Sequence, residues 1–374
     1  MSRKTTSVTP GTTTVDVDVG ATRVLRVGVD LGTNTTVVEG AENGERFEVN
    51  PSLITTVVGY PKAGIIPGIL PSDGGPLFGE EAIEYRLHLD LKWPMKDGFV
   101  EDPDVAREFT QYLRSIVDES AHETQIWGVV GAPANASLER QAEIRTALRG
   151  FLDRLLIVPE PFLAAMGLRE DDGFRDAGSH GDPTKHSLII DIGAGTSDLC
   201  LVRGYFPTAA DQVSIPRAGN SVDDSIAAGI ANRFPDLNLT SVTVTSIKEK
   251  HSFVTGHERD ADVKVYVEGR PQTIDLKDII GSACESLVPE IVRGIQHLLK
   301  RCDSDSVVPV MKNIIVTGGG SQIPGISDRI QTVLNEEGYD CARAIQPADY
   351  KLLVAKGALR IAENVRNDQW QMAM

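Results

Sequence analysis

Two short segments share an Asp-x-Gly-x-x-Thr pattern whose residue types suit the binding of a phosphate group. The first spans Asp30 to Thr35 and the second spans Asp191 to Thr196, and each follows an apolar run rich in β-branched residues. A glycine-rich turn lets backbone N–H groups approach phosphate oxygens, because it adds little side-chain bulk and permits positive φ. The phosphate-binding residues expected from these turns are Gly32, Thr33, Asn34, Thr35, Gly193, Ala194, Gly195 and Thr196.

The two aspartates supply the second part of this chemistry. Asp30 and Asp191 each stand at the end of the apolar run that precedes the turn. A protein-bound Mg²⁺ ion keeps several of its waters and is held by a few carboxylates together with phosphate oxygens. We therefore expect Asp30 and Asp191 to hold Mg²⁺ through water, while the two turns clamp one polyphosphate between them.

An internal repeat must position these residues. Arg26–Val38 and Ser187–Leu199 match at one constant offset, and both have the pattern of a strand, a tight turn and a second strand. One copy opens each half of the chain. Two other nucleotide-binding arrangements fit poorly, because the sequence has no G-x-x-x-x-G-K-[ST] loop and neither turn is a G-x-G-x-x-G turn that opens a helix.

The remaining elements follow from apolar spacing. It predicts helices over 103–120, 137–155, 281–301 and 352–364, and strands over 127–133 and 312–317. Ser137 is expected to cap the second helix, and Pro289 to kink the third. Strands that alternate with helices in two halves indicate an α/β protein with a duplicated core.

Length and charge restrict the classes of function. The chain has 374 residues, more than one domain of roughly 100–200, which favours two lobes with a cleft between them. The formal net charge is −16, so most of the surface would repel a phosphate backbone, and nucleic acid is not expected as a partner. The four cysteines are far apart, as in reduced cytosolic proteins.

The first residues of the chain carry no targeting pattern. Residues 1–24 are rich in Thr and Val but lack the run of about 7–15 apolar residues that a signal peptide needs. No stretch approaches the ~20 apolar residues of a membrane span. We expect a flexible tail over 1–24, a cytoplasmic location and no direct membrane insertion.

Several further motifs, in order, resemble those of the superfamily of actins, sugar kinases and heat-shock chaperones. The two Asp-x-Gly-x-x-Thr turns look like its two phosphate motifs, and Thr317–Arg329 is similar to its adenosine motif. Leu91–Gly98 and Ile247–Lys250 look specifically actin-like. Within the bacterial actins, Val57–Lys62 and other stretches resemble the magnetosome-associated filament proteins.

This resemblance implies an actin-like ATPase fold of two lobes, each built on a ribonuclease H-like core, with the nucleotide in the cleft between them. The implied first lobe comprises 25–187 plus 345–374, with a small subdomain inserted at about 41–93. The implied second lobe comprises 188–344, with an insertion at about 221–280. The implied ligands are ATP or ADP with Mg²⁺, and the implied nucleoside-binding residues are Gly219, Asn220, Asp223, Lys248, Glu249, Gly318, Gly319, Gly320 and Ile323.

Glu160 is the expected catalytic residue. It stands between two prolines in Val158-Pro-Glu-Pro-Phe162, where local stiffness fixes the direction of its side chain. Phosphoryl transfer to water needs a residue that orients the attacking water, and the resemblance gives that role to Glu160. Val37 stands where actin has a phosphate-contacting Lys, so backbone amides and Mg²⁺ must neutralise more of the phosphate charge.

The resemblance implies a polymerising ATPase whose subunits associate head to tail in cytoplasmic filaments, with adaptor proteins of an organelle such as the magnetosome as possible partners. A cell-shape actin of the MreB type fits less well, because residues 1–24 offer no amphipathic membrane-binding helix. A small-metabolite kinase on the same fold is the alternative of another class. A chaperone ATPase is disfavoured, since about ten residues follow the last expected helix.

Overall fold

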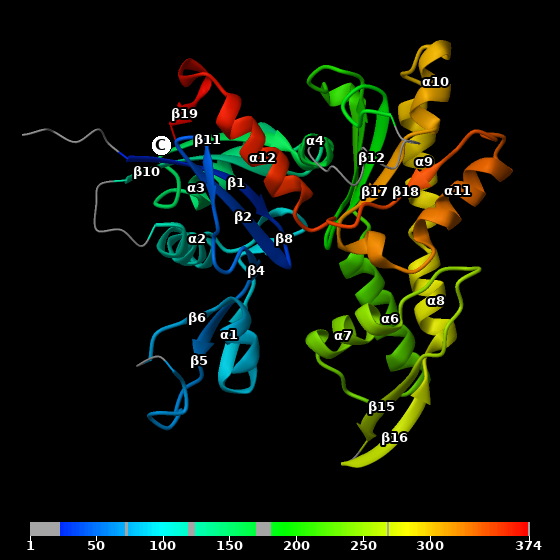
Figure 1. Cartoon of the computed structure of the whole chain (residues 1–374). Helices are drawn as coiled ribbons and strands as arrows, with labels where there is room; N and C mark the ends of the chain where they lie inside the picture. The colour runs from blue at the N-terminus through cyan, green and yellow to red at the C-terminus, as the bar shows by residue number, and fades with distance from the viewer. Residues whose placement is uncertain (1–22, 72–73, 119–123, 170–180, 268, 373–374) are drawn as a thin grey trace, which may run out of the picture.

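Two β-sheets form the framework of the molecule and lie side by side in Figure 1. The computed structural model describes residues 23–71, 74–118, 124–169, 181–267 and 269–372. One sheet has seven strands and the other has five. We call the part built on the larger sheet the first lobe, and the part built on the smaller sheet the second lobe.

The larger sheet is centred on β1, which begins at Arg23. Its neighbour β2 is antiparallel to β1, whereas β10 and β11 run parallel to it. The sheet order is β19-β11-β10-β1-β2-β3, with β4 also paired to β2. The strands are β1 Arg23–Leu31, β2 Thr35–Glu42, β3 Glu45–Phe47, β4 Leu53–Thr55, β10 Thr124–Ala132, β11 Arg154–Pro159 and β19 Gln371–Met372.

The smaller sheet repeats this arrangement strand for strand. Its order is β14-β13-β12-β17-β18, with β13 antiparallel to β12 and with β17 and β18 parallel to it. The strands are β12 Ser187–Ile192, β13 Ser197–Val202, β14 Gln212–Ile215, β17 Ile314–Thr317 and β18 Ala344–Ile345. The duplication predicted from two hairpins therefore extends to five strands in each lobe.

Two helices join the lobes. Helix α4, Glu160–Leu168, follows β11, and helix α12, Leu353–Asn364, follows β18 at the equivalent place in the second lobe. The helices pack on each other, while α12 also covers β1 and β10 and α4 lies against β12 and β13 (Figure 1). Each helix thus covers the sheet of the opposite lobe, and one apolar cluster contains residues of both sheets and both helices.

Glycines let these two helices approach closely. A methyl group on Gly357 would overlap the carbonyl oxygen of Leu163, and one on Gly167 would overlap the carbonyl oxygen of Leu353. Gly28 in β1 is in equally close contact with the backbone of α12. Because the opposing atoms belong to the backbone, no side-chain rearrangement could make room for a larger residue.

A small inserted segment projects from the first lobe. Its elements are β5 Val58–Pro61, β6 Leu77–Phe78, α1 Gly79–Glu84, the 3₁₀ turn η1 Arg86–His88 and β7 Leu89–Lys92. The predicted insertion at about 41–93 began too early, because β3 and β4 pair with β2 in the main sheet. The main sheet therefore continues to Thr55 before the insertion begins.

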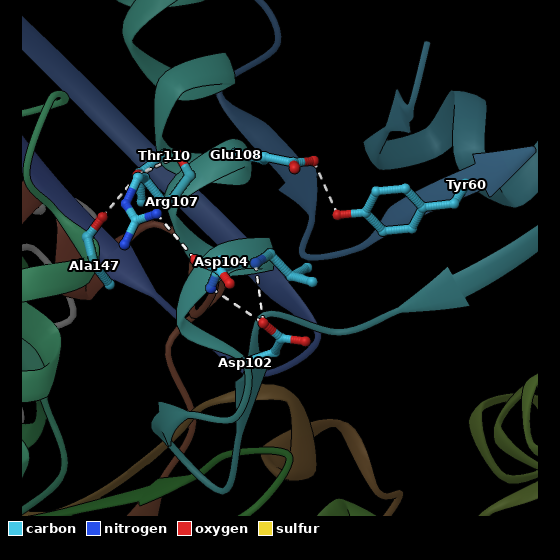
Figure 2. A network of polar contacts seen from close by, with 8 residues as sticks. Tyr60, Asp102, Asp104, Arg107, Glu108, Thr110 and Ala147 are labelled. Carbon is cyan, nitrogen blue, oxygen red and sulfur yellow. Dashed lines mark hydrogen bonds and ion pairs between the residues drawn. The ribbon is translucent and has the colours of Figure 1, made fainter. Parts of the chain in front are cut away.

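Figure 2 shows how this insertion is attached to helix α2, Pro103–Val117. Asp102 caps the helix by accepting from the N–H groups of Asp104 and Val105. Further along the same helix, Glu108 accepts a hydrogen bond of 2.9 Å from the Tyr60 hydroxyl of β5. Phe78 of β6 also stacks on Tyr112 with ring centroids 4.7 Å apart. These contacts, together with the ion pair of Lys92 in β7 and Asp102 at 3.9 Å, fix the insertion to the lobe.

A group of helices and a two-stranded ribbon projects from the second lobe and overlaps the insertion proposed at about 221–280. Helices α6 Gly219–Arg233 and α7 Ser241–His251, the ribbon β15 Asp262–Val267 and β16 Arg270–Asp275, and helix α8 Lys277–Glu285 make it up (Figure 1). The expectation of one kinked helix over 281–301 was wrong. The chain instead forms α8 and a separate α9, Val288–Leu299, because Pro289 occupies the first turn of a new helix, where its missing N–H is not needed.

The remaining elements complete the two lobes. The expected helix over 137–155 begins at the Ser137 cap but ends as α3 at Ala147, since Gly150 has φ of 90° and β11 follows. The others are β8 Met95–Lys96, β9 Phe99–Val100, η2 Ala209–Asp211, α10 Ser304–Met311, η3 Gly319–Gln322, α11 Ile326–Glu336 and η4 Asn367–Gln369. None of the helices within the described ranges has the length and apolar character to cross a membrane.

The division of the chain into a tail and two lobes remains a proposal. The tail expected over 1–24 falls on residues 1–22, outside the described ranges, and on the first two residues of β1. The second sheet begins with Ser187 of β12 and ends with Ile345 of β18, so each end lies one residue outside the proposed second lobe 188–344.

The helix crossing predicts a large effect of a small substitution. Gly357→Ala should lower the free energy of unfolding by at least about 2 kcal/mol, because the new methyl group overlaps a backbone carbonyl. This loss exceeds the gain of up to about 1 kcal/mol that alanine brings to a helix. Denaturant unfolding measures the difference. Gly75→Ala, whose methyl group meets no atom within 4 Å, is the matched control, and equal stability of the two variants would contradict the role of the crossing.

Candidate functional site

The two Asp-x-Gly-x-x-Thr turns face one cavity of about 470 Å³. The first turn joins β1 to β2 and the second joins β12 to β13, so the cavity lies between the lobes. Predicted residues that line it are Asp30, Gly32, Thr33, Asn34, Thr35, Glu160, Asp191, Gly193, Ala194, Gly195, Thr196, Gly219, Lys248, Glu249, Gly318, Gly319, Gly320 and Ile323. Parts of the chain far apart in sequence thus meet at one site.

Backbone hydrogen bonds hold the second turn in shape. The Gly193 N–H donates to the carbonyl oxygen of Thr196 across the turn, at 2.9 Å. At the start of α6, the N–H groups of Gly219 and Asn220 donate to the carbonyl oxygens of Gly193 and Ala194. With its carbonyl groups bound in this way, the turn is rigid before any ligand arrives.

Two predicted nucleoside-binding residues do not line the cavity. Asn220 acts through its backbone on the second turn. Asp223 lies one helical turn further along α6, where its carboxylate accepts from Lys248 Nζ at 2.8 Å and from the Thr245 hydroxyl at 2.9 Å. Asp223 therefore holds Lys248, which does line the cavity.

Four buried carboxylates lie near the two glycine turns, and three of them line the cavity. Burial raises the pKa of Asp30 to about 7 and that of Asp198 to about 6. Burial, and then repulsion by neighbouring carboxylates, holds the pKa of Glu160 and Asp191 well above the usual range. A site that raises the pKa of four acids in this way favours a cation.

The donor set fits Mg²⁺ held through its waters. Within the described ranges, no group of three or more His, Cys, Asp or Glu residues lies close enough to hold a metal ion directly. No hydrogen bond from those ranges reaches the Asp30 or Asp191 carboxylates, although Asp191 is only 8% exposed. Carboxylates that face a cavity without partners suit the outer shell of a hydrated cation.

Few positive charges offset these acids. Lys248 and Lys351 are the lysines among the lining residues, and Lys248 is already paired with Asp223. Val37 lines the first turn and is 2% exposed, so no charge comes from that position. Backbone N–H groups and a bound cation therefore remain to neutralise a phosphate group here.

Glycine is required where the adenosine-like motif meets the second strand. Gly318 has φ of 78°, and a methyl group on it would overlap Asp191 Oδ1 and the backbone of Ile192. By contrast, a methyl group on Gly319 would meet no atom within 4 Å. Gly318 thus brings the chain against Asp191, while the following glycine leaves open space in the cavity.

Glu160 is the first residue of α4, where the positive end of the helix dipole favours a carboxylate. Behind it, a methyl group on Gly131 would lie 2.8 Å from Glu160 Cγ, so the glycine makes room for the side chain. Gly131 was not singled out from the sequence. Its only signal was a glycine within an apolar strand, which often marks a close approach of another group.

Sequence reasoning also missed part of the lining. The further lining residues are Leu53, Gly98, Ser252, Gln322, Tyr350, Lys351 and Val354. Gly98 carried a usable signal, because Asp-Gly is a strong turn dipeptide. The others sit in ordinary strand, helix and loop sequence and come to the cavity only through the fold.

Comparison with known proteins gives this site a context. The family model for MreB/Mbl protein matches residues 24–369. The chain belongs to the MreB/Mbl family. It is 32% identical to the actin-like protein MamK of Magnetospirillum gryphiswaldense, over 92% of this chain and 91% of that protein. It is 23% identical to the cell shape-determining protein MreB of Pasteurella multocida, over 62% of this chain and 66% of that protein.

Solved structures show that the MreB/Mbl chain has an actin-like fold. A MamK double helical filament matches with a TM-score of 0.81 and 32% identity, over 92% of this chain and 100% of that one. A non-polymerising MamK mutant bound to AMPPNP matches with a TM-score of 0.62 and 31% identity, over the same shares. The predicted fold class and the predicted resemblance to bacterial actins, MamK in particular, are confirmed.

The raised acid pKa values predict a characteristic pH dependence without ligands. Between the ordinary pKa of aspartate, about 4, and the value of about 7 for Asp30, the folded state binds more protons than the unfolded state. The free energy of unfolding contributed by Asp30 is therefore lost as pH rises through this range. Asp30→Asn should raise the free energy of unfolding at pH 8 by up to about 4 kcal/mol, at about 1.4 kcal/mol for each unit by which burial raises the pKa, and should flatten the pH dependence.

Denaturant unfolding at pH 5 and pH 8 in EDTA, without nucleotide, measures this effect. Asp90→Asn changes an exposed aspartate of β7 and serves as the control, which should leave the pH dependence unchanged. A loss of stability at pH 8 in Asp30→Asn would show that burial of the charged Asp30 carboxylate does not destabilise the folded state.

Proposed function

We propose that this protein is an ATPase that assembles head to tail into cytoskeletal filaments in an ATP-dependent manner. The observation that carries the proposal is the single cavity to which each lobe contributes one glycine turn and one aspartate, with Glu160 between them. A ligand that binds both turns at once favours one angle between the lobes. Its hydrolysis would then change the surface that each subunit presents to the next.

The proposed roles follow from the donor set. Backbone N–H groups of the two turns bind the phosphates, and Asp30 and Asp191 hold the Mg²⁺ waters. Mg²⁺, when bound, neutralises charge on the phosphate oxygens. Lys248, Glu249 and Ile323 line the same cavity and are proposed to contact the nucleoside. The AMPPNP-bound MamK relative supports a nucleotide as the ligand.

Glu160 is proposed to orient the attacking water and accept its proton. Its raised pKa makes it a stronger base than an ordinary glutamate, and a neighbouring cation would stabilise its charged form. Pro159 before it and Pro161 after it restrict the backbone from which the side chain points. A positioned base of this kind suits hydrolysis, because the attacking water must be oriented toward the phosphorus atom.

For the cellular role of this protein, similarity to MamK is a better guide than similarity to MreB. Identity and coverage are both higher for MamK than for MreB, so we propose an organelle-positioning filament, of the magnetosome or of another organelle, before a cell-shape role. Heterologous contacts that do not close into a ring give filaments, so self-association needs two complementary surfaces on opposite ends. Adaptor proteins would link such a filament to its cargo.

Electron microscopy with ATP turnover tests the proposal. The purified protein should form filaments with Mg-ATP, and phosphate release per subunit should rise with protein concentration. The kinase alternative gives the opposite result, with no filaments and turnover that depends on an added hydroxyl substrate. Filaments absent under all nucleotide conditions would overturn the assembly part of the proposal.

Glu160→Gln separates hydrolysis from binding. It should slow phosphate release by about 100-fold or more, because a positioned base contributes a factor of this order. ATP affinity should change little, and filaments should disassemble more slowly. Glu139→Gln on the exposed face of α3 is the matched control. Lost ATP binding in Glu160→Gln would refute the assigned role.

Asp191→Ala tests the metal assignment. It removes the most buried unpartnered carboxylate of the cavity, so the affinity for ATP in the presence of Mg²⁺ should fall by about tenfold or more. Affinity for ATP in EDTA should not fall, since removing a negative charge there relieves repulsion. An unchanged Mg-ATP affinity, measured by fluorescence of a labelled nucleotide, would sink the assignment.

A further inference from the structure

The hairpin of β8 and β9 touches the first phosphate turn. Its turn residues Asp97 and Gly98 both have positive φ, 52° and 76°, as in a tight two-residue hairpin turn. The Gly98 N–H donates to the Thr33 hydroxyl at 3.0 Å. Thr33 is only 8% exposed. Its hydroxyl is therefore held in place by the β8–β9 hairpin, a segment that the phosphate motifs themselves do not include.

The same hairpin turn also touches the loop that follows β10. A methyl group on Gly98 would overlap the ring of Pro133, so the two residues are in close van der Waals contact. Pro133 begins the short connection between β10 and α3. A displacement of the hairpin turn therefore acts directly on this loop.

The next residue of that loop crosses to the second lobe. The Ala134 N–H donates to Asp198 Oδ1 at 3.1 Å, and the Thr196 hydroxyl donates to Asp198 Oδ2 at 2.6 Å. Asp198 lies in β13 and is 1% exposed. Its two oxygens thus join a first-lobe loop to the second phosphate turn.

Two further contacts join the loops of the first lobe to the second lobe. The Asn135 side-chain amide donates to the backbone oxygen of Gln212 in β14 at 2.7 Å. A methyl group on Gly195 of the second phosphate turn would overlap the Cα atom of Asp97. The hairpin turn thus meets both phosphate turns, one through a hydrogen bond and the other through backbone packing.

These contacts form one continuous path between the phosphate turns. We call it the turn-to-turn path, and it consists of Thr33, Gly98, Pro133, Ala134, Asp198 and Thr196. We propose that Asp198 is a positioning residue that fixes the second phosphate turn to the first lobe, so that the path sets the spacing of the two turns. The inference rests on the proposed nucleotide-binding function of the cavity.

The geometry separates Asp198 from the metal-facing acids. Asp30 and Asp191 line the cavity, whereas Asp198 does not and uses both oxygens on protein donors. Its hydrogen bonds with Ser214, Thr196 and Ala134 lower its pKa against the larger effect of burial. Three donors to one buried carboxylate are a structural arrangement, because they leave few lone pairs for the waters of a metal ion.

The turn-to-turn path would affect phosphoryl transfer by fixing the distance between the two phosphate turns. The reacting phosphate must contact both turns at once, and a displacement of about 1 Å can reduce a rate by about 100-fold. Packed contacts and hydrogen bonds in series transmit a shift of one turn to the other. Phosphate bound to one turn would thus preset the other.

The first experiment compares Asp198→Ala with Asp198→Asn. The alanine removes both acceptors, and ATP turnover should fall by about tenfold or more. The asparagine should retain turnover within about threefold, because its oxygen still accepts from Ala134 and its amide can donate to the Thr196 hydroxyl. The Mg²⁺ concentration for half-maximal turnover should be the same in wild type and both variants. An asparagine as damaging as alanine, with a raised Mg²⁺ requirement, would make Asp198 a metal residue and overturn the proposal.

The second experiment is a double-mutant cycle with Thr33→Val and Asp198→Ala, read as affinity for a fluorescent ATP analogue. The residues lie in different lobes and share no direct contact, so independent effects would multiply. If both residues act through one path, the second substitution should add little to the first. The loss of affinity in the double variant should then be smaller than the product of the two single losses by a factor of about three or more. Multiplying effects would overturn the path. Ile323→Ala with Asp198→Ala is the control pair, which should multiply because Ile323 lies outside the path.

The same cycle on the free energy of unfolding, without nucleotide, distinguishes the two proposals. If wild-type protein binds no ATP, the proposed function fails, and the nucleotide-free cycle alone decides whether the path exists. Gly181→Ala adds a methyl group with only an ordinary contact, at 3.6 Å, and controls for unspecific destabilisation. Additive unfolding energies for Thr33→Val and Asp198→Ala would overturn the path in the nucleotide-free protein.

Discussion

The close crossing of α4 and α12 is the constraint on which the rest of the structure depends. Gly167 and Gly357 let the helix backbones touch, and the crossing holds two sheets whose strands otherwise belong to separate lobes. Both helices begin at the cavity, α4 with Glu160 and α12 beside Val354. A contact between two backbones therefore decides where a carboxylate stands relative to two phosphate turns contributed by different sheets.

The charge in the cavity opposes the stabilising effect of the helix crossing. Buried acids at one end raise each other's pKa, and only a few lysines line the same space. Charging these acids at neutral pH is therefore expected to oppose folding of the nucleotide-free protein, as is usual at functional sites. Binding of a cation and a phosphate would remove this repulsion, so occupancy of the cavity and rigidity of the lobes rise together.

Much of the fold and site was predictable because it repeats. The matched turns at Asp30 and Asp191 indicated duplication, and periodicity located α2 and α12. Helix ends were harder: Pro289 starts a new helix where a kink was expected, since proline suits a first turn as well as a bend. Asp223 lies behind the cavity wall and not on it, a difference that residue type alone does not show. Gly131 and Gly98 act through neighbours remote in sequence, which local patterns do not contain.

The positions of α4 and α12 have a consequence for the history of the molecule. Each helix follows the last parallel strand of its own sheet but packs on the strands of the other lobe. This is the arrangement of two identical subunits that exchange arms, here within one chain. A duplicated ancestor that dimerised by swapping its final helix would give this topology once its two genes were fused. Neither half would then bury both faces of its own sheet alone, and separation of the lobes would amount to unfolding, whereas rotation about the crossing would not.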